Sequence, residues 1–370
     1  MFSLRLRNYW WLLIWMFLGL MFLERFPKRR ERLGGRIEER WSVLAAVLLV
    51  LPYIVWAGFR GYVADTTLYR IGFLNTEANL AVIPQMLADP TREDVGFEVF
   101  VVLMRCLVGE NAELFFLTIA AIQGLCMALT FRRFSSNYWV SMFLFVASTD
   151  YMSWMMNGMR QFIAVTVIFA CFGWLVRKKY IPLILVILGI STFHQSALLM
   201  IPIVFVVQGQ VWNYKTILMM IATVVVVFFV DRFTPLLNDM LQNTNYDTAL
   251  GEEVLSADDG TNAVRVLVYS VPALLSLVGI RAIRRANDPV INVSANCAIV
   301  TMALYLVSMV TSGIYIGRLP IYTTLQGYIA VPWLIDHIFE RRSAKVVAGM
   351  MVLLFCAFFY YQMFLTWNYA

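Results

Sequence analysis

The chain has 370 residues, of which 61% are hydrophobic and only 14% are charged. Soluble globular domains average about 45–50% apolar and about 25% charged residues, so this composition excludes a soluble globular protein. It favours a membrane protein with several spans, as does the mean hydropathy of +0.73. The net charge of +6 is not interpreted as nucleic-acid binding, because the basic excess of a membrane protein usually lies in its cytoplasmic loops.

Apolar segments of nearly spanning length recur along the whole chain. A spanning helix needs about 20 mostly apolar residues, and fewer where neighbouring helices cover its ends. We therefore expect an all-α integral membrane protein with about twelve transmembrane helices in a single domain, residues 1–370. The expected spans are roughly 8–23, 41–59, 112–131, 138–153, 160–176, 180–193, 196–208, 214–231, 263–280, 291–312, 320–337 and 345–363. We expect no cleaved signal peptide, because the first segment lacks a small-residue cleavage site.

Basic residues are unequally divided between the two sets of loops that these spans create. With the loop at 25–40 in the cytoplasm, 19 of the 29 Lys and Arg residues fall on the cytoplasmic side. The outer side carries the other ten, together with most of the acidic residues. This bias follows the positive-inside rule and predicts an even number of spans with both termini outside.

Two expected external segments, 60–111 and 232–262, are too long to be simple connections. Loops beyond about 12–15 residues are usually functional or disordered, and both segments carry apolar residues at helical spacing. We expect an interfacial or re-entrant helix in 97–108, and a shorter helix in 233–241 within the second, acidic segment. We therefore expect the chemistry of the protein on the outer face.

Few residue patterns in this sequence carry recognisable chemistry. There is no Gly-rich phosphate loop and no HExxH motif, and two histidines are too few for a multi-histidine metal site. The five cysteines lack metal-ligand spacing and are expected to be small buried hydrophobic side chains. We expect no metal or other cofactor. The ionisable residues at the outer ends of spans are the candidates, because charges near the membrane are costly and mark functional sites by default.

Three residues stand out among these candidates. His194 lies in a polar interruption, 191–197, where it acts as a base or hydrogen-bond donor, or only satisfies the backbone of a tight turn. Arg160 opens an apolar span, where a helix N-terminus and a guanidinium favour an anion, unless the side chain only extends to the interface. Arg318 lies between two spans, and its neighbouring glycines allow backbone or ligand to approach closely.

Other candidates lie on the first external segment and at further span ends. A helix there places Asp65 and Tyr69 on one face with Arg70 beside them, which suits either a site or a local cap and ion pair. Glu98 starts the expected interfacial helix as a catalytic acid or as a partner of the helix dipole. The remaining candidates are two arginines for an anionic substrate, Arg60 and Arg265.

The order of these motifs resembles the EpsG/Wzy-type family of bacterial polysaccharide polymerases. The matching segments are Asp65–Phe73, Phe97–Phe100, Met159–Ala164, Phe193–Ala197, and Gly317–Arg318 followed by Tyr322. One departure concerns the acidic residue that usually stands immediately before the first tyrosine of the family. Here Asp65 lies four residues ahead of Tyr69.

The resemblance implies an enzyme of the bacterial inner membrane whose periplasmic face transfers a growing glycan from undecaprenyl diphosphate. The acceptor is the nonreducing-end hydroxyl of a new lipid-linked repeat unit, and His194, Asp65 or Glu98 takes its proton. Partners implied are the lipid-linked oligosaccharide, membrane lipids, and a flippase and chain-length regulator of the same pathway. The assigned diphosphate ligands are Arg160, Arg318, Arg70, Arg60 and Arg265, and the assigned sugar contacts are Tyr69, Gln161, Gln195 and Tyr322.

Other functions stay open at this point. A transporter or flippase of lipid-linked oligosaccharide also needs cations for its substrate, although we find no internal repeat of the kind that many transporters carry. A ligase that moves the finished glycan to another lipid shares the same chemistry. A membrane acyltransferase usually takes a cytosolic acyl donor, which the outer charge bias disfavours. Nothing in the sequence favours a non-catalytic scaffold.

Overall fold

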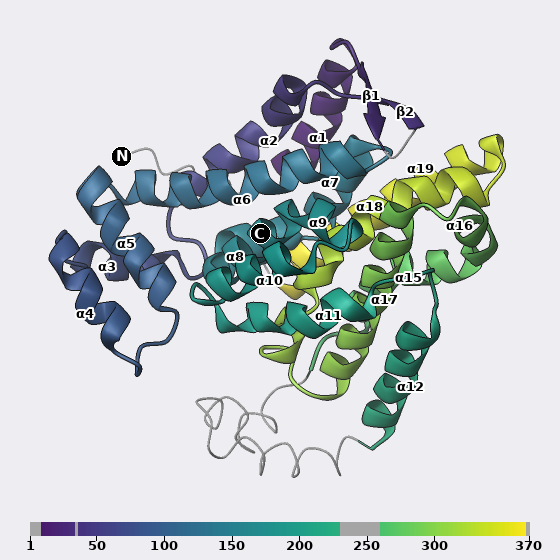
Figure 1. Cartoon of the computed structure of the whole chain (residues 1–370). Helices are drawn as coiled ribbons and strands as arrows, with labels where there is room; N and C mark the ends of the chain where they lie inside the picture. The colour runs from purple at the N-terminus through teal and green to yellow at the C-terminus, as the bar shows by residue number, and fades with distance from the viewer. Residues whose placement is uncertain (1–8, 34–35, 230–259, 368–370) are drawn as a thin grey trace. The chain divides into compact units, whose positions relative to one another are not determined.

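The computed structural model describes residues 9–33, 36–229 and 260–367 (Figure 1). These residues form helices almost throughout, with one two-stranded antiparallel hairpin, which confirms the predicted helical class. The chain divides into two compact units, one made of Met1–Ile201 with Arg342–Ala370 and the other of Pro202–Arg341. Each unit is described by itself below.

The first unit contains most of the predicted site motifs. Its elements are α1 (Trp10–Leu23), β1 (Arg29–Leu33), β2 (Arg36–Arg40), α2 (Val43–Gly58), α3 (Thr66–Asn75), η1 (Leu80–Val82), α4 (Ile83–Ala88), α5 (Val95–Val108), α6 (Ala112–Phe134), α7 (Tyr138–Ala147), η2 (Tyr151–Asn157), α8 (Met159–Ala170), α9 (Phe172–Val176), α10 (Tyr180–Ser191), η3 (Gln195–Leu199), α19 (Arg341–Tyr360) and η5 (Tyr361–Thr366).

The long helix α6 forms the axis of this unit, and α2 packs along it (Figure 1). The Asn111 side chain accepts a hydrogen bond from the Leu114 amide at 3.0 Å and caps the start of α6, while Arg132 and Arg133 occupy its last turn. Two glycines let the helices approach closely. A Cβ at Gly58 would lie 3.0 Å from the Leu117 Cα, and one at Gly124 would overlap the Ile54 side chain.

Buried polar side chains connect α6 and α7 to neighbouring backbone. The Gln123 amide donates to the Met159 carbonyl at 2.9 Å, and the Tyr138 hydroxyl donates to the Ala46 carbonyl at 2.8 Å. Such bonds are the means by which polar groups are satisfied inside a largely apolar bundle. The first of them fixes the start of α8 against α6, where the π-helical segment η2 ends at Asn157 and α8 begins after Gly158.

The second unit is built around α17. Its elements, with α11 beginning at the boundary, are α11 (Met200–Val206), α12 (Tyr214–Phe228), α15 (Ala263–Val278), α16 (Ile280–Ala286), α17 (Pro289–Val310), η4 (Ile316–Arg318) and α18 (Ile321–Ile338). Two buried asparagines of α17 hold the loop before α12. Asn292 Oδ1 accepts from the Val211 amide at 2.9 Å, and Asn296 Nδ2 donates to the Val207 carbonyl at 3.0 Å.

The helices of the described residues support a membrane protein. Three are long and apolar enough to cross a membrane, namely Ala112–Phe134, Pro289–Val310 and Arg341–Thr366, and a fourth span is formed if α15 and α16, which are bent by 65°, are counted together. Seven shorter apolar helices of 10–17 residues accompany them. A helix overlaps each of the expected spans, but the number twelve, which requires every one of them to cross, stays a prediction.

The external segments are described in part. The helix expected in 97–108 is present as α5, preceded by three short helical elements, and its place at the membrane interface stays a prediction. The helix expected in 233–241 lies outside the described residues, as does most of the acidic segment 232–262.

Candidate functional site

The candidate site lies at one end of the first unit, where α3, α5, α8 and the turn before η3 meet. Two aspartates mark it. Asp65 and Asp94 occupy the N-cap positions of α3 and α5, yet neither side chain accepts a hydrogen bond from its own helix. An N-cap aspartate normally accepts from the amides of its own first turn. Asp65 instead contacts Asn157, the last residue of η2, and Asp94 contacts Arg160 in the first turn of α8.

Asp94 forms an ion pair with Arg160. The Arg160 Nη1 atom lies 2.9 Å from Asp94 Oδ2, and Arg160 Nε donates to the Tyr69 hydroxyl at 3.2 Å. The Asp94 side chain is 12% exposed and that of Arg160 is 40% exposed. The pair therefore joins α5 to α8 while leaving part of the guanidinium accessible. Burial raises the pKa of the Asp94 carboxyl, and the charge of Arg160 opposes that rise.

Asp65 contacts the residue that ends η2. With the Asn157 amide nitrogen turned toward Asp65, it donates to the two carboxylate oxygens at 2.9 and 3.1 Å. The Tyr69 amide donates to the Asp65 carbonyl at 3.2 Å, so Tyr69 follows one helical turn later. Asp65, Tyr69 and Asp94 thus surround the start of α8 from two different helices.

The buried ring of Phe97 packs against this cluster. Its ring is buried, with 6% exposed, and lies 5.8 Å from the Arg160 guanidinium carbon. Tyr69 meets it edge-on with ring centroids 5.9 Å apart, and Phe193 packs against it at 6.2 Å. The guanidinium over an aromatic face and the edge-on ring contacts are both favourable geometries. Phe97 therefore fixes the relative positions of Arg160 and Tyr69.

The turn that carries His194 is docked on the start of α5. The Gly96 amide donates to the Thr192 carbonyl at 2.8 Å, and a Cβ at Gly96 would overlap the Thr192 side chain. The Gln195 amide donates to Asp94 Oδ1 at 3.2 Å. His194 is half-buried, and its Nδ1 lies 2.7 Å from the Ser196 hydroxyl. The close glycine contact thus brings the polar interruption seen in the sequence next to Asp94.

Arg60 lies behind the cluster and supports it. Its side chain is buried, with 5% exposed, and Nη1 donates to the Met155 carbonyl at 2.7 Å and to the Met156 carbonyl at 3.2 Å. These carbonyls belong to the last turn of η2, immediately before Asn157. Burial lowers the pKa of Arg60 to about 10, so the guanidinium stays charged at neutral pH. The structure therefore places Arg60 where it holds the backbone before Arg160.

Arg70 lies beside Arg60, because both guanidiniums contact the Phe116 ring. The guanidinium carbon of Arg70 lies 5.7 Å from the centroid of this ring, and that of Arg60 lies 4.8 Å from it. Arg70 Nη1 also forms an ion pair with Glu113 Oε1 at 3.0 Å. The Arg70 side chain is 20% exposed and that of Glu113 is 41% exposed, so Arg70 is charge-paired at the edge of the cluster.

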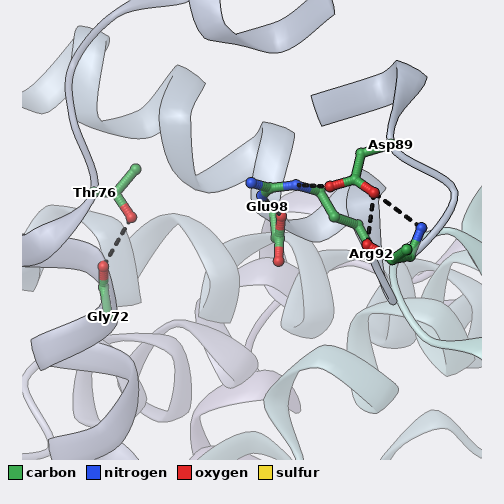
Figure 2. Close-up of polar contacts among 6 residues, drawn as sticks. Gly72, Thr76, Asp89, Arg92 and Glu98 are labelled. Carbon is green, nitrogen blue, oxygen red and sulfur yellow. Dashed lines mark hydrogen bonds and ion pairs between the residues drawn. The ribbon is translucent and has the colours of Figure 1, made fainter. Parts of the chain in front are cut away.

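Glu98 points to a different partner. Its Oε2 lies 2.6 Å from Nη1 of Arg92, whose Nε lies 3.4 Å from Asp89 (Figure 2). All three side chains are about two-fifths exposed, and exposed ion pairs of this kind contribute little to stability. Glu98 lies in α5, the helix that Asp94 precedes, but its carboxylate pairs with Arg92 on the surface and not with Arg160.

The other residues assigned from the sequence lie elsewhere. Gln161 is buried in α8 with 3% exposed, whereas Gln195 is exposed in the docked turn. The rest belong to the second unit: Arg265 lies 5.5 Å over Tyr269, Arg318 is exposed at the end of η4, and Tyr322 is buried. The glycines near Arg318 were expected to allow a close backbone approach. Such an approach is present between Gly313 and Gly260, because a Cβ at Gly313 would lie 2.8 Å from the Gly260 carbonyl oxygen.

Sequence reasoning missed Asp94 as a site residue. It directly precedes the predicted helix and therefore looks like an ordinary N-cap. Its backbone is left-handed, with φ +50°, a conformation that aspartate and asparagine adopt more readily than most residues. In the described part of the chain, no group of three or more His, Cys, Asp or Glu side chains is placed to hold a metal ion.

We expect Asp94→Asn to raise thermal stability at neutral pH. Because burial raises the pKa of the folded carboxyl above its unfolded value, the ionised form costs stability, and that cost is absent below the unfolded pKa. Asparagine tolerates the left-handed backbone and still offers an oxygen to the Gln195 amide. Thermal melting of the purified protein should show a gain at neutral pH that shrinks as the pH falls. Glu77→Gln, at an exposed glutamate elsewhere in the same external segment, is the control, and a loss of stability in Asp94→Asn at neutral pH would contradict this account.

Comparison with known proteins agrees with the motifs. The family model described as the EpsG family matches residues 43–369, which is most of the chain and includes every segment of the site. Neither the search of curated proteins nor that of solved structures found a match. The resemblance drawn from the motifs is confirmed, and the chain belongs to the EpsG family.

Proposed function

We propose that this protein is a polysaccharide polymerase that transfers a growing glycan from undecaprenyl diphosphate to a new lipid-linked repeat unit. The family supports a role in polysaccharide polymerisation. The observation that carries the proposal is the pair of N-cap aspartates, Asp65 and Asp94, which contact Asn157 and Arg160 instead of capping their own helices. N-cap residues that give up their usual hydrogen bonds for contacts elsewhere are typical of functional sites.

Arg160 is the proposed diphosphate ligand. Its side chain is partly exposed and stands in the first turn of α8, where unpaired amides and the helix dipole favour an anion. A guanidinium binds phosphate oxygens in a bidentate manner. In this role Arg160 stabilises the charge that develops on the departing diphosphate. Arg60 positions the backbone before it. The assignment of Arg265 and Arg318 to the same ligand stays a prediction.

The proposed reaction is a single displacement at the anomeric carbon of the lipid-linked donor. The acceptor hydroxyl oxygen forms a bond to that carbon, while the bond from the carbon to the diphosphate oxygen breaks. The lipid diphosphate leaves with the electron pair, and a base on the protein takes the hydroxyl proton. His194 is the first candidate base, because its hydrogen bond to Ser196 orients the ring beside Asp94 and an imidazole accepts a proton near neutral pH. Asp65 is the alternative.

Removal of the guanidinium tests the proposed role of Arg160. In proteoliposomes supplied with lipid-linked repeat units, Arg160→Ala should lower the rate of chain growth by about a hundredfold or more, as for other donors that stabilise a leaving charge. Arg133→Ala, at an exposed arginine in the last turn of α6, is the matched control and should keep its activity. Unchanged chain growth in Arg160→Ala would overturn the site. Lipid translocation without chain growth in the unmodified protein would favour a flippase.

The identity of the base is tested by two conservative variants. His194→Gln keeps a polar side chain but cannot accept the proton, so we expect chain growth to fall by about a hundredfold or more. Asp65→Asn can still hydrogen-bond Asn157 and should retain a measurable part of the activity. The opposite pattern, with His194→Gln active and Asp65→Asn inactive, would assign the base to Asp65. Circular dichroism of each variant controls for folding.

We also propose that the site faces the periplasm of the inner membrane, as the basic residues of the opposite loops suggest. Single cysteines at Glu93 and Arg133, in a background without the native cysteines, report the two faces. In intact cells with a permeabilised outer membrane, an impermeant maleimide should label Glu93→Cys and leave Arg133→Cys unlabelled until the inner membrane is opened. The reverse labelling would place the site in the cytoplasm.

A further inference from the structure

A buried carboxylate lies in the apolar segment that leads into α8. Asp150 follows α7 and directly precedes η2, and its side chain is fully buried. Its Oδ2 atom accepts a hydrogen bond from the Ser148 hydroxyl at 3.0 Å, and its Oδ1 atom accepts one from Nε1 of Trp154 at 3.2 Å. An ionisable residue inside a membrane segment is costly and marks a function by default. Neither the motifs nor the proposed function uses Asp150 or Trp154.

The backbone around Asp150 departs twice from an ordinary helix. Thr149 is buried and left-handed, with φ +68°, which is a genuine outlier for a β-branched residue. Its hydroxyl has no hydrogen-bond partner among the described residues, so no bond of that side chain offsets the strain. The chain then continues as the π-helical segment η2, a form that is frequent at functional sites. Strain of this kind persists only where the surrounding contacts over-determine it, and it indicates a functional constraint on this segment.

The Trp154 ring connects Asp150 to the break before α8. It is buried, and the indole N–H that binds Asp150 is its only polar group. The six-membered ring lies against Gly158, where a Cβ would be 3.1 Å from Cε3 and 3.2 Å from Cζ3 of Trp154. Gly158 has φ −62° and ψ 51°, which is close to the common inverse γ-turn and is open to other residues. The ring, and not the backbone conformation, therefore requires glycine at this position.

The hydrogen bonds of Gly158 change the helix type at the residue that the ring contacts. Its amide donates to the Ser153 carbonyl at 3.3 Å, which is a π-helical bond. Its carbonyl accepts from the Phe162 amide at 2.9 Å, which is an α-helical bond. Arg160 stands in the turn that this second bond closes. The position of Gly158 therefore determines where the Arg160 guanidinium meets Asp94.

We propose that Trp154 is a positioning residue for Arg160 and that Asp150 holds it in place. The hydrogen bond to Asp150 orients the indole, the ring contacts Gly158, and Gly158 directs the first turn of α8 toward Asp94. Trp154 acts through this backbone and not by contact with a substrate. The inference rests on the proposed function, because it assigns Trp154 a part in the same reaction. A misplacement of about 1 Å far from the chemistry can cost a rate about a hundredfold, so a small shift of this turn matters.

Chain growth in proteoliposomes tests the proposal when kcat and KM are measured separately. Trp154→Phe keeps an aromatic ring but removes the indole N–H, so we expect kcat to fall about tenfold or more while KM for the lipid-linked unit stays nearly unchanged. Gly158→Ala displaces the same ring and should have a similar effect. Ser153→Ala is the matched control, because the Ser153 hydroxyl is buried next to Trp154 in the sequence and has no hydrogen-bond partner among the described residues to lose.

A double-mutant cycle tests the link between Asp150 and Trp154, because it isolates the pair from whatever else each side chain contacts. Asp150→Ala should lower kcat by itself. In that background the further change from Trp154→Phe should be less than about twofold, since the hydrogen bond is already absent. A full loss of about tenfold repeated in the Asp150→Ala background would overturn the role of this hydrogen bond.

Hydrogen exchange of the same full-length variants gives a readout that does not depend on activity. Amides in the first turn of α8 should exchange faster in Trp154→Phe and Gly158→Ala than in the unmodified protein, with Ser153→Ala unchanged. If the unmodified protein shows no chain growth, the proposed function fails, and exchange alone decides whether Trp154 holds this turn. Equal exchange in all variants, or an unchanged kcat in Trp154→Phe and Gly158→Ala, overturns the positioning role. If Trp154→Phe does not fold, Gly158→Ala decides alone.

Discussion

The contact on which the candidate site depends is the ion pair between Asp94 and Arg160. It joins the start of α5 to the start of α8. Asp94 also accepts a hydrogen bond from the Gln195 amide, which belongs to the turn that carries His194. Three segments that are far apart in the sequence are therefore held at one carboxylate. Because burial raises the pKa of Asp94, its charge is kept at a cost in stability, as is common at functional sites.

The rest of the first unit supports this contact from behind. Arg60 holds the carbonyls that end η2, and Gln123 holds the carbonyl of Met159, so the backbone on both sides of Asn157 is fixed. The buried ring of Phe97 keeps Arg160 and Tyr69 in place. The break between η2 and α8 is thus a rigid feature, and it directs the first turn of α8 toward the aspartates.

Sequence reasoning predicted most of the residues that meet at the candidate site, but not Asp94. Arg160, Asp65 and His194 were predicted because ionisable residues at span ends are conspicuous, and helix positions followed from apolar segments. Asp94 was missed because an N-cap aspartate is ordinary in sequence, and only the fold shows that it turns away from its helix. Glu98 was a plausible acid by position, but the side chain that pairs with it, Arg92, lies six residues earlier in a loop of irregular path. Periodicity cannot predict such a pairing.

The charge balance of the site limits which ligands can bind it. In the first unit Arg160 is paired with Asp94 and Arg70 with Glu113, so neither guanidinium attracts a weak or neutral ligand strongly. A ligand shares Arg160 with the carboxylate of Asp94, because that ion pair leaves part of the guanidinium accessible. A neutral sugar hydroxyl gains little from a guanidinium that is already paired, whereas a diphosphate carries more charge and more acceptor oxygens than one carboxylate. A diphosphate bound to Arg160 would place a new anion beside the half-buried carboxylate of Asp94, which raises the proton affinity of that carboxylate further. Binding of the anion and protonation of Asp94 are therefore thermodynamically coupled in this arrangement.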